Sequence, residues 1–161
     1  MEAKPDTAGV IAPPPLIALS TLVLGILIQF LAPSSGVAVI PDWLRHFLAA
    51  ALILMGCALI WRANRSFIAA GTPAPPWRPS TTLVTGDVFA HVRNPMYFGG
   101  GLLLFGIGLL IADDWLILMT MISMIIIHFG VILREERYLD AKFGEVYRSY
   151  KARVPRYGWR P

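Results

Sequence analysis

The sequence is nearly without cysteine, because Cys57 is the only one among 161 residues. A single cysteine excludes an intramolecular disulfide framework and a cysteine-based metal site. Charge is scarce as well: Asp, Glu, Lys and Arg make up only 15% of the chain, against about a quarter in soluble domains. The composition therefore excludes an ordinary water-soluble domain, and we interpret Cys57 as a small buried hydrophobe.

Apolar residues are abundant instead. They account for 56% of the chain and give a mean hydropathy of +0.61. A helix that crosses the hydrocarbon core of a bilayer needs roughly 20 mostly apolar residues. Four runs approach that length, over about 16–32, 44–61, 95–112 and 115–133. We therefore expect an all-α integral membrane protein with about four transmembrane helices.

The basic residues predict how these helices are oriented. Twelve of the fourteen lysines and arginines fall between the second and third runs or after the fourth. Cytoplasmic loops of membrane proteins carry an excess of Lys and Arg. The distribution therefore predicts a multi-pass protein with both chain ends and the middle loop in the cytoplasm. The basic residues are grouped on one side of the membrane rather than on one face of a folded domain, so we expect no nucleic-acid partner.

Three regions are expected along the chain. Residues 1–15, rich in Ala and Pro, are predicted to form a poorly ordered tail. Residues 16–62 hold the first two membrane helices, and the first is expected to be retained rather than cleaved as a signal peptide, because Lys4 is offset by Glu2 and Asp6. Residues 63–161 are predicted to be the catalytic region, with a long Pro-rich loop over 71–94.

The last two runs carry unusual residues. Glycines are crowded in the third run, where pairs seven apart share a helix face that a neighbouring helix or a flat ligand could contact; helix packing accounts for most of the pattern. At the end of the fourth run and just beyond it, His128 and Glu135 are seven apart and are expected to project from one face. Such groups usually face a cavity, although His128 could instead bond to a backbone carbonyl of another helix. The periodic residues from Glu136 to Tyr150 predict a cytoplasmic amphipathic helix.

Three short blocks stand out in the second half of the chain: Thr82-Leu83-Val84-Thr85-Gly86, Arg93-Asn94-Pro95-Met96-Tyr97-Phe98-Gly99 and Glu135-Glu136-Arg137-Tyr138-Leu139. Their order and spacing resemble the isoprenylcysteine carboxyl methyltransferase family and its bacterial relatives, which include phospholipid methyltransferase-like proteins. The resemblance covers roughly residues 71–156. It implies a methyltransferase of the bacterial inner membrane that uses S-adenosyl-L-methionine in a cleft open to the cytosol.

The resemblance also implies the residues of that cleft. The implied cofactor-binding residues are Thr81, Thr82, Leu83, Val84, Phe89, Asn94, Pro95, Met96, Tyr97, His128 and Glu135. The implied catalytic residues are Arg93, Arg134, Glu135 and Glu136. The prenylcysteine enzymes of the family usually have His where this chain has Asn94, and an arginine for the substrate carboxylate where it has Val131. Arg93 or Arg134 would therefore have to bind a carboxylate acceptor.

The residue types also suit the cofactor chemically. S-adenosyl-L-methionine has an adenine for apolar side chains, hydroxyls and a carboxylate for polar partners, and an ammonium for a carboxylate. Asn94, Tyr97 and Glu135 supply such a mixed set. Methyl transfer depends on in-line positioning and exclusion of water, so no metal is expected. The expected partners are the lipid bilayer and a lipophilic or interfacial acceptor, of which a prenylcysteine-like carboxylate is one candidate.

Two other functions remain open on the sequence. A nicotinamide-dependent membrane reductase would share the C-terminal architecture, but it needs a larger membrane region and an arginine cluster for the adenine phosphate. A small transporter or a non-enzymatic scaffold is the other. A proton-coupled transporter needs an ionisable residue within a span, whereas Glu135 and Glu136 lie at the end of the last one.

Overall fold

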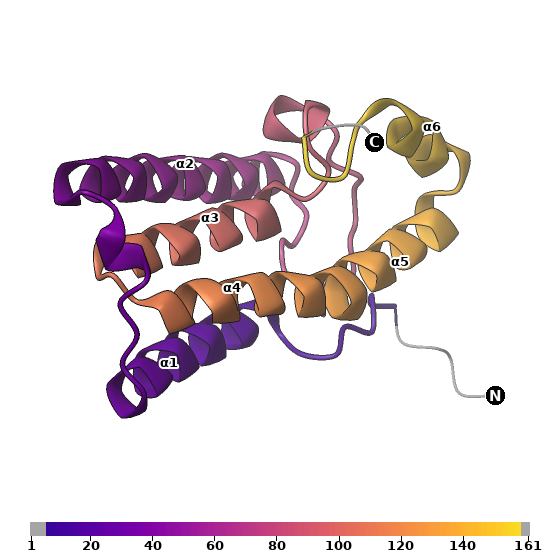
Figure 1. The fold of residues 1–161 in the computed structure, drawn as a ribbon. Coiled ribbons are helices and arrows are strands. Elements are labelled where there is room, and N and C mark those ends of the chain that lie inside the picture. The colour runs from indigo at the N-terminus through magenta and orange to yellow at the C-terminus, as the bar shows by residue number, and fades with distance from the viewer. Residues whose placement is uncertain (1–5, 159–161) are drawn as a thin grey trace.

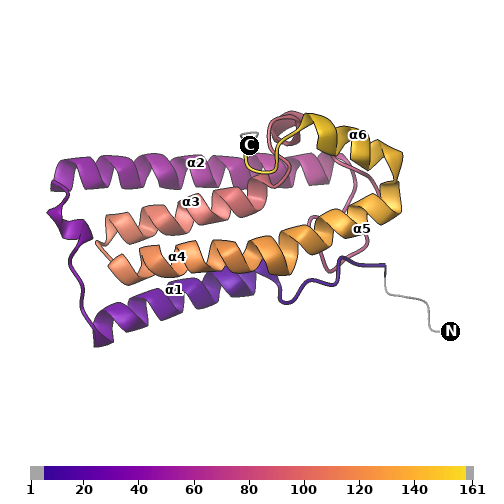
Figure 2. The same cartoon turned by 45° about the vertical axis from the view of Figure 1, so that its right-hand side comes forward.

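The computed structural model describes residues 6–158, and within that range the chain forms helices and irregular segments without a β-strand. Four apolar helices lie side by side in the order α2, α3, α4, α1 (Figure 2). They are α1 (Pro14–Leu31), α2 (Asp42–Ala69), α3 (Pro95–Leu110) and α4 (Asp114–Ile127). The prediction of an all-α membrane protein is confirmed.

Three of the helical stretches are long and apolar enough to cross a bilayer, namely α1, α2 and the stretch Asp114–Phe143 that begins with α4. The remaining predicted span, the third along the chain, is α3. It has 16 residues, which makes it about 24 Å long and shorter than a hydrocarbon core of roughly 30 Å. Large apolar side chains such as Phe30, Phe47 and Leu54 are exposed, as expected of surfaces that face lipid. Cys57 is exposed too; its predicted burial is wrong, because α2 is covered mainly on the side that packs against α3.

Glycines allow α3 to approach both of its neighbours. A Cβ on Gly99 would lie 2.8 Å from the Gly56 carbonyl oxygen of α2, and one on Gly106 would lie 3.0 Å from the Ala49 oxygen. On the α4 side, a Cβ on Gly108 would lie 2.7 Å from Ile117 Cγ1. Small residues permit this spacing between membrane helices, so the helix-packing interpretation of these positions is confirmed.

The last membrane helix is not a regular α-helix throughout. After α4 it continues through a π-helical turn, η3 (His128–Ile132), into α5 (Leu133–Phe143). The π turn widens the repeat, so the seven-residue spacing of His128 and Glu135 no longer places them on one α-helical face. The predicted C-terminal amphipathic helix is also two helices, since Gly144 with φ 53° ends α5 and the chain turns into α6 (Glu145–Arg153; Figure 1).

The segment before α1, residues 6–13, forms a strap along η3 and the middle loop. The Ile11 amide donates to the Gly130 carbonyl at 3.2 Å, and the Ala8 amide donates to the Pro76 carbonyl at 3.2 Å. The Ile11 side chain occupies the space that Gly130 leaves open. Residues 6–13 of the predicted tail are therefore held by the fold, while residues 1–5 lie outside the described range.

Polar contacts fix the opposite end of the bundle. The Asp114 carboxylate accepts from the amides of Gly36 at 2.6 Å and Val37 at 2.8 Å, next to the short helix η1 (Val37–Val39). Buried Arg45 donates to the carbonyls of Leu109 and Leu110, at 2.9 and 3.1 Å. Because the last carbonyls of a helix lack intrahelical partners, Arg45 stabilises the end of α3.

Candidate active site

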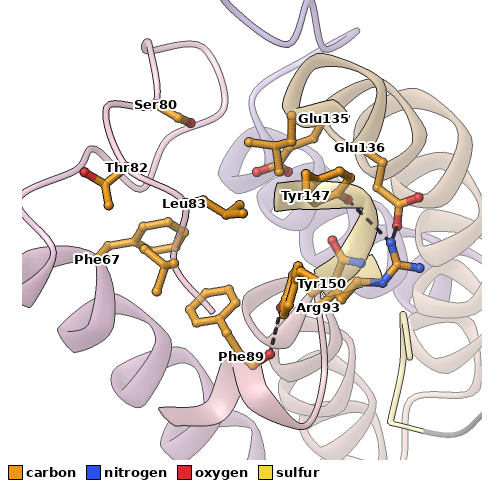
Figure 3. A pocket seen from close by; sticks show the side chains of 13 residues that line it. Phe67, Ser80, Thr82, Leu83, Phe89, Arg93, Glu135, Glu136, Tyr147 and Tyr150 are labelled. Atoms are coloured by element: carbon orange, nitrogen blue, oxygen red, sulfur yellow. Dashed lines mark hydrogen bonds and ion pairs between the residues drawn. The ribbon is translucent and has the colours of Figure 1, made fainter. Parts of the chain in front are cut away.

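A pocket lies at the end of the bundle where α2 ends and α3 begins, and its walls come from segments that are distant in the sequence (Figure 3). One wall is the middle loop with the short helix η2 (Asp87–Ala90), and the other is α5 with α6. We call it the polar pocket. Its lining residues are Phe67, Ser80, Thr82, Leu83, Val84, Phe89, Arg93, Asn94, Glu135, Glu136, Leu139, Tyr147 and Tyr150.

The contact between Tyr97 and Glu135 joins α3 to α5 beside the polar pocket. The Tyr97 phenol donates to Glu135 Oε2 at 2.8 Å, and both side chains are half-buried. Both residues also line a small hollow, formed with Pro95 and Met96, that shares Arg93, Asn94 and Glu135 with the polar pocket. The second and third sequence blocks therefore meet at one place, and Glu135 presents a carboxylate there.

The neighbouring Glu136 belongs to a buried ion cluster. Arg93 Nη1 lies 2.8 Å from Glu136 Oε1, and Arg156 donates to both carboxylate oxygens, at 2.8 Å each. The side chains of Arg93 and Glu136 are only 8% and 6% exposed. One carboxylate thus accepts from two guanidinium groups, an arrangement that offsets the cost of burying the charges. The predicted catalytic residues Arg93 and Glu136 already bind each other.

The C-terminal segment after α6 closes this side of the site. Its carbonyl groups accept from the Arg93 amide, through Pro155 at 3.0 Å, and from the Asn94 side chain, through Arg156 at 3.4 Å. Farther along, the Tyr157 hydroxyl lies 2.5 Å from His128 Nδ1. His128 therefore lies outside the polar pocket, and its contact is a tyrosine rather than the backbone carbonyl that the sequence left open.

The loop wall of the pocket is connected to the strap through Tyr138 of α5. The Ser80 amide donates to the Tyr138 hydroxyl at 3.0 Å, and that hydroxyl lies 3.0 Å from Asp6 Oδ1 and from Lys142 Nζ. The Thr81 amide donates to Thr72 Oγ1 at 2.9 Å. These bonds fix the backbone immediately before the first sequence block, where the loop enters the pocket wall.

Two buried tyrosines of α6 complete the wall. The Tyr150 hydroxyl donates to the Phe89 carbonyl at 2.7 Å, and the Phe89 ring contacts Phe67 edge-on at 5.2 Å between centroids. Burial raises the pKa of Tyr147 to about 12, and burial likewise raises the pKa of Tyr150 above its ordinary value. Both phenols therefore stay neutral to a higher pH than an ordinary tyrosine, so α6 adds no charge to the pocket through them.

An apolar groove of about 400 Å³ begins where the small hollow ends. The α3 residues Met96 and Tyr97 line both. Its floor is formed by α3 and α4, and its sides by α1, α2 and the loop; the remaining lining residues are Pro14, Pro15, Ala18, Ile60, Asn64, Ala74, Pro75, Pro76, Trp77, Gly100, Gly101, Leu104, Ser123, Met124 and Ile127. The hydrogen-bonded pair Tyr97–Glu135 thus lies between a polar pocket and a lipophilic one.

Most of the predicted site residues meet here. Those that line the polar pocket or the adjoining hollow are Thr82, Leu83, Val84, Phe89, Arg93, Asn94, Pro95, Met96, Tyr97, Glu135 and Glu136. Three others lie outside both. Thr81 is exposed and donates to the Gly71 carbonyl, Arg134 is exposed and donates to the Gly9 carbonyl of the strap, and His128 contacts Tyr157.

The sequence did not predict several residues of the site. Phe67, Tyr147 and Tyr150 line the pocket, although the tyrosines carried only the periodicity of an amphipathic helix. Arg156 appeared only as one of many cytoplasmic cations. The signal that could have found it is the pair of adjacent glutamates, because two buried carboxylates need cationic or donor partners.

A family model described as phospholipid methyltransferase matches residues 44–146. That range runs from α2 to the start of α6 and includes Tyr97, Glu135 and the loop wall of the polar pocket. No curated protein and no solved structure matches the chain.

Proposed function

The chain belongs to the phospholipid methyltransferase family, the family of isoprenylcysteine carboxyl methyltransferase-like proteins, and is a membrane methyltransferase; from this premise we propose that it transfers the methyl group of S-adenosyl-L-methionine to a lipophilic acceptor. The observation that carries the proposal is the position of Tyr97 and Glu135 between the polar pocket and the apolar groove. The family also argues against the reductase and scaffold alternatives.

The donor set of the polar pocket fits this cofactor. Among residues 6–158, the hydrogen bond that Glu135 accepts comes from Tyr97, which leaves carboxylate capacity for an ammonium group. Asn94 supplies an amide, and Phe67, Leu83 and Phe89 supply an apolar surface for an adenine ring. When bound, the cofactor supplies a methyl group on a sulfonium centre. The chain's own residues hold it, orient it and exclude water from its positive charge.

The apolar groove suits the hydrocarbon part of the acceptor. It extends from Tyr97 along α3 toward Leu104, over about 10 Å at 1.5 Å per residue. A lipid whose chain lies in the groove would present its head group to Tyr97 and Glu135. The concentration of basic residues at this end supports a cytoplasmic position for the polar pocket, and we propose the inner membrane of a bacterium as its location.

Calorimetry with S-adenosylhomocysteine tests the proposal on purified protein. We expect binding by the wild type, a loss of roughly 10-fold to 100-fold for Glu135→Gln, and a smaller loss for Tyr97→Phe, because a hydrogen bond to a charged group is worth about 1.5–3 kcal/mol. Glu145→Gln is the matched control, since Glu145 is exposed and pairs with Arg148 away from the pocket. Wild-type protein that does not bind the ligand at millimolar concentration would overturn the proposal.

A further inference from the structure

The five glycines of α3 do not all have the same structural role. Four of them contact a neighbouring helix closely: Gly99 and Gly106 face α2, and Gly101 and Gly108 face α4. Gly100 differs, because no described atom would lie within 4 Å of a Cβ added to it, leaving aside its own helix backbone. Helix packing therefore accounts for four of these glycines but not for Gly100.

Gly100 lies on the groove side of α3. The α3 residues that line the apolar groove are Met96, Tyr97, Gly100, Gly101 and Leu104, which share one helical face at spacings of three and four. Gly100 lies one turn beyond Met96, about 6 Å farther along the helix. At the adjacent Gly101, an added Cβ would lie 2.8 Å from Met124 Sδ. The floor of the groove is thus left open by a missing side chain at Gly100.

A glycine inside a helix lowers the stability of the helix, and a bound ligand can explain why the glycine is present. Glycine is less favourable than alanine by about 1 kcal/mol in a helix interior, and in membrane helices its usual benefit is the close approach of another helix. At Gly100 that benefit is absent among the described residues, whereas the groove next to it shares Met96 and Tyr97 with the small hollow that Glu135 lines.

We propose that Gly100 determines acceptor specificity by leaving the space through which a long hydrocarbon chain of the acceptor passes from Tyr97 into the groove. The inference rests on the proposed function, since it concerns the acceptor of that reaction. A larger side chain at position 100 blocks the groove one turn beyond Tyr97. Long-chain lipids are then excluded, while the polar pocket is unchanged because Gly100 does not line it.

The test measures binding of tritiated palmitate to purified protein by scintillation proximity, with octanoate and laurate as competitors. For the wild type we expect palmitate to bind more tightly than laurate, and laurate more tightly than octanoate, since each buried methylene adds to the affinity. Gly100→Leu should weaken palmitate binding by about tenfold or more and remove the preference for longer chains. Gly100→Ala should show a smaller loss.

Two controls distinguish blockage of the groove from a general effect of a larger side chain and from misfolding. Ala51→Leu places the same bulk on an exposed face of α2, outside the groove, and should bind palmitate as the wild type does. S-adenosylhomocysteine binding by Gly100→Leu should be unchanged, which also shows that the variant is folded. Unaltered palmitate binding by Gly100→Leu, an equal loss in Ala51→Leu, or no palmitate binding by the wild type would each overturn the inference. Failure of the proposed function is distinct, because the wild type would then not bind S-adenosylhomocysteine.

Discussion

Glu135 and Glu136 are neighbours in sequence but have different partners. Both line the polar pocket, but Glu136 is held by buried Arg93 and partly exposed Arg156, whereas Glu135 accepts from the neutral Tyr97. Successive residues of a helix point about 100° apart, so α5 can direct one carboxylate to the ion cluster and the other to a ligand. The sequence showed two adjacent glutamates, but it could not show which one joins the ion cluster and which one faces a ligand.

Glu136→Gln should destabilise the protein rather than alter its ligand contacts directly. Removing one partner of a buried ion cluster leaves uncompensated charge and typically costs about 3–5 kcal/mol. We expect a clear fall in the unfolding temperature of Glu136→Gln in detergent, measured by circular dichroism. Glu135→Gln serves as the comparison and should unfold close to the wild-type temperature; equal stabilities of the two variants would contradict the division between these residues.

The buried tyrosine Tyr147 predicts a pH dependence in the alkaline range. Burial raises its pKa from 10.0 to about 12 in the folded protein, so the native state keeps a proton that the unfolded state releases. The stabilisation is fully present below pH 10 and declines as the pH rises from 10 to 12. Chemical unfolding across this window should show a decline that is smaller in Tyr147→Phe; equal slopes in both proteins would count against the burial of this phenol.

At the scale of elements, the long apolar helices could be predicted and the interruptions could not. Hydropathy and length indicate α1, α2 and α4, because a membrane helix needs a long apolar run. The π turn η3 could not be predicted from composition, because it depends on tertiary packing such as that of Ile11 on Gly130. The break at Gly144 did have a signal, because glycine commonly ends a helix in a left-handed conformation, but the apolar periodicity on both sides favoured one continuous helix.

Tyr138 connects three elements, and its removal should loosen the loop wall of the site. Tyr138→Phe deletes the hydroxyl that accepts from the Ser80 amide and contacts Asp6 and Lys142. We expect faster hydrogen exchange at Ser80 and its loop neighbours, together with S-adenosylhomocysteine binding weakened by roughly threefold to tenfold. Arg137→Gln changes an exposed neighbour and is the control. Unchanged exchange at Ser80 would show that the hydroxyl does not restrain the loop.

At the scale of the whole molecule, the sequence predicted the membrane class and most of the pocket. The three blocks indicated a shared site because their order and spacing resemble one methyltransferase family, and their residue types also suit one amphipathic ligand. Contributions from other parts of the chain, such as Phe67 of α2 and Arg156 of the C-terminal segment, depend on tertiary contacts. A single sequence holds no direct record of those contacts. The adjacent glutamates indicate that a cationic partner is needed, but they do not show that it is Arg156, and nothing in the sequence indicates Phe67.

The order of the helices in the bundle differs from their order in the chain. α1 packs on α4 rather than on α2, and the Trp115 indole donates to the Ala32 carbonyl, 83 positions earlier. During synthesis, a chain that has been inserted only through α3 still lacks the main surface on which its first helix rests. α1 can therefore dock only after the last membrane helix has been inserted. Docking of α1 is thus a late step of assembly, and it closes one side of the groove.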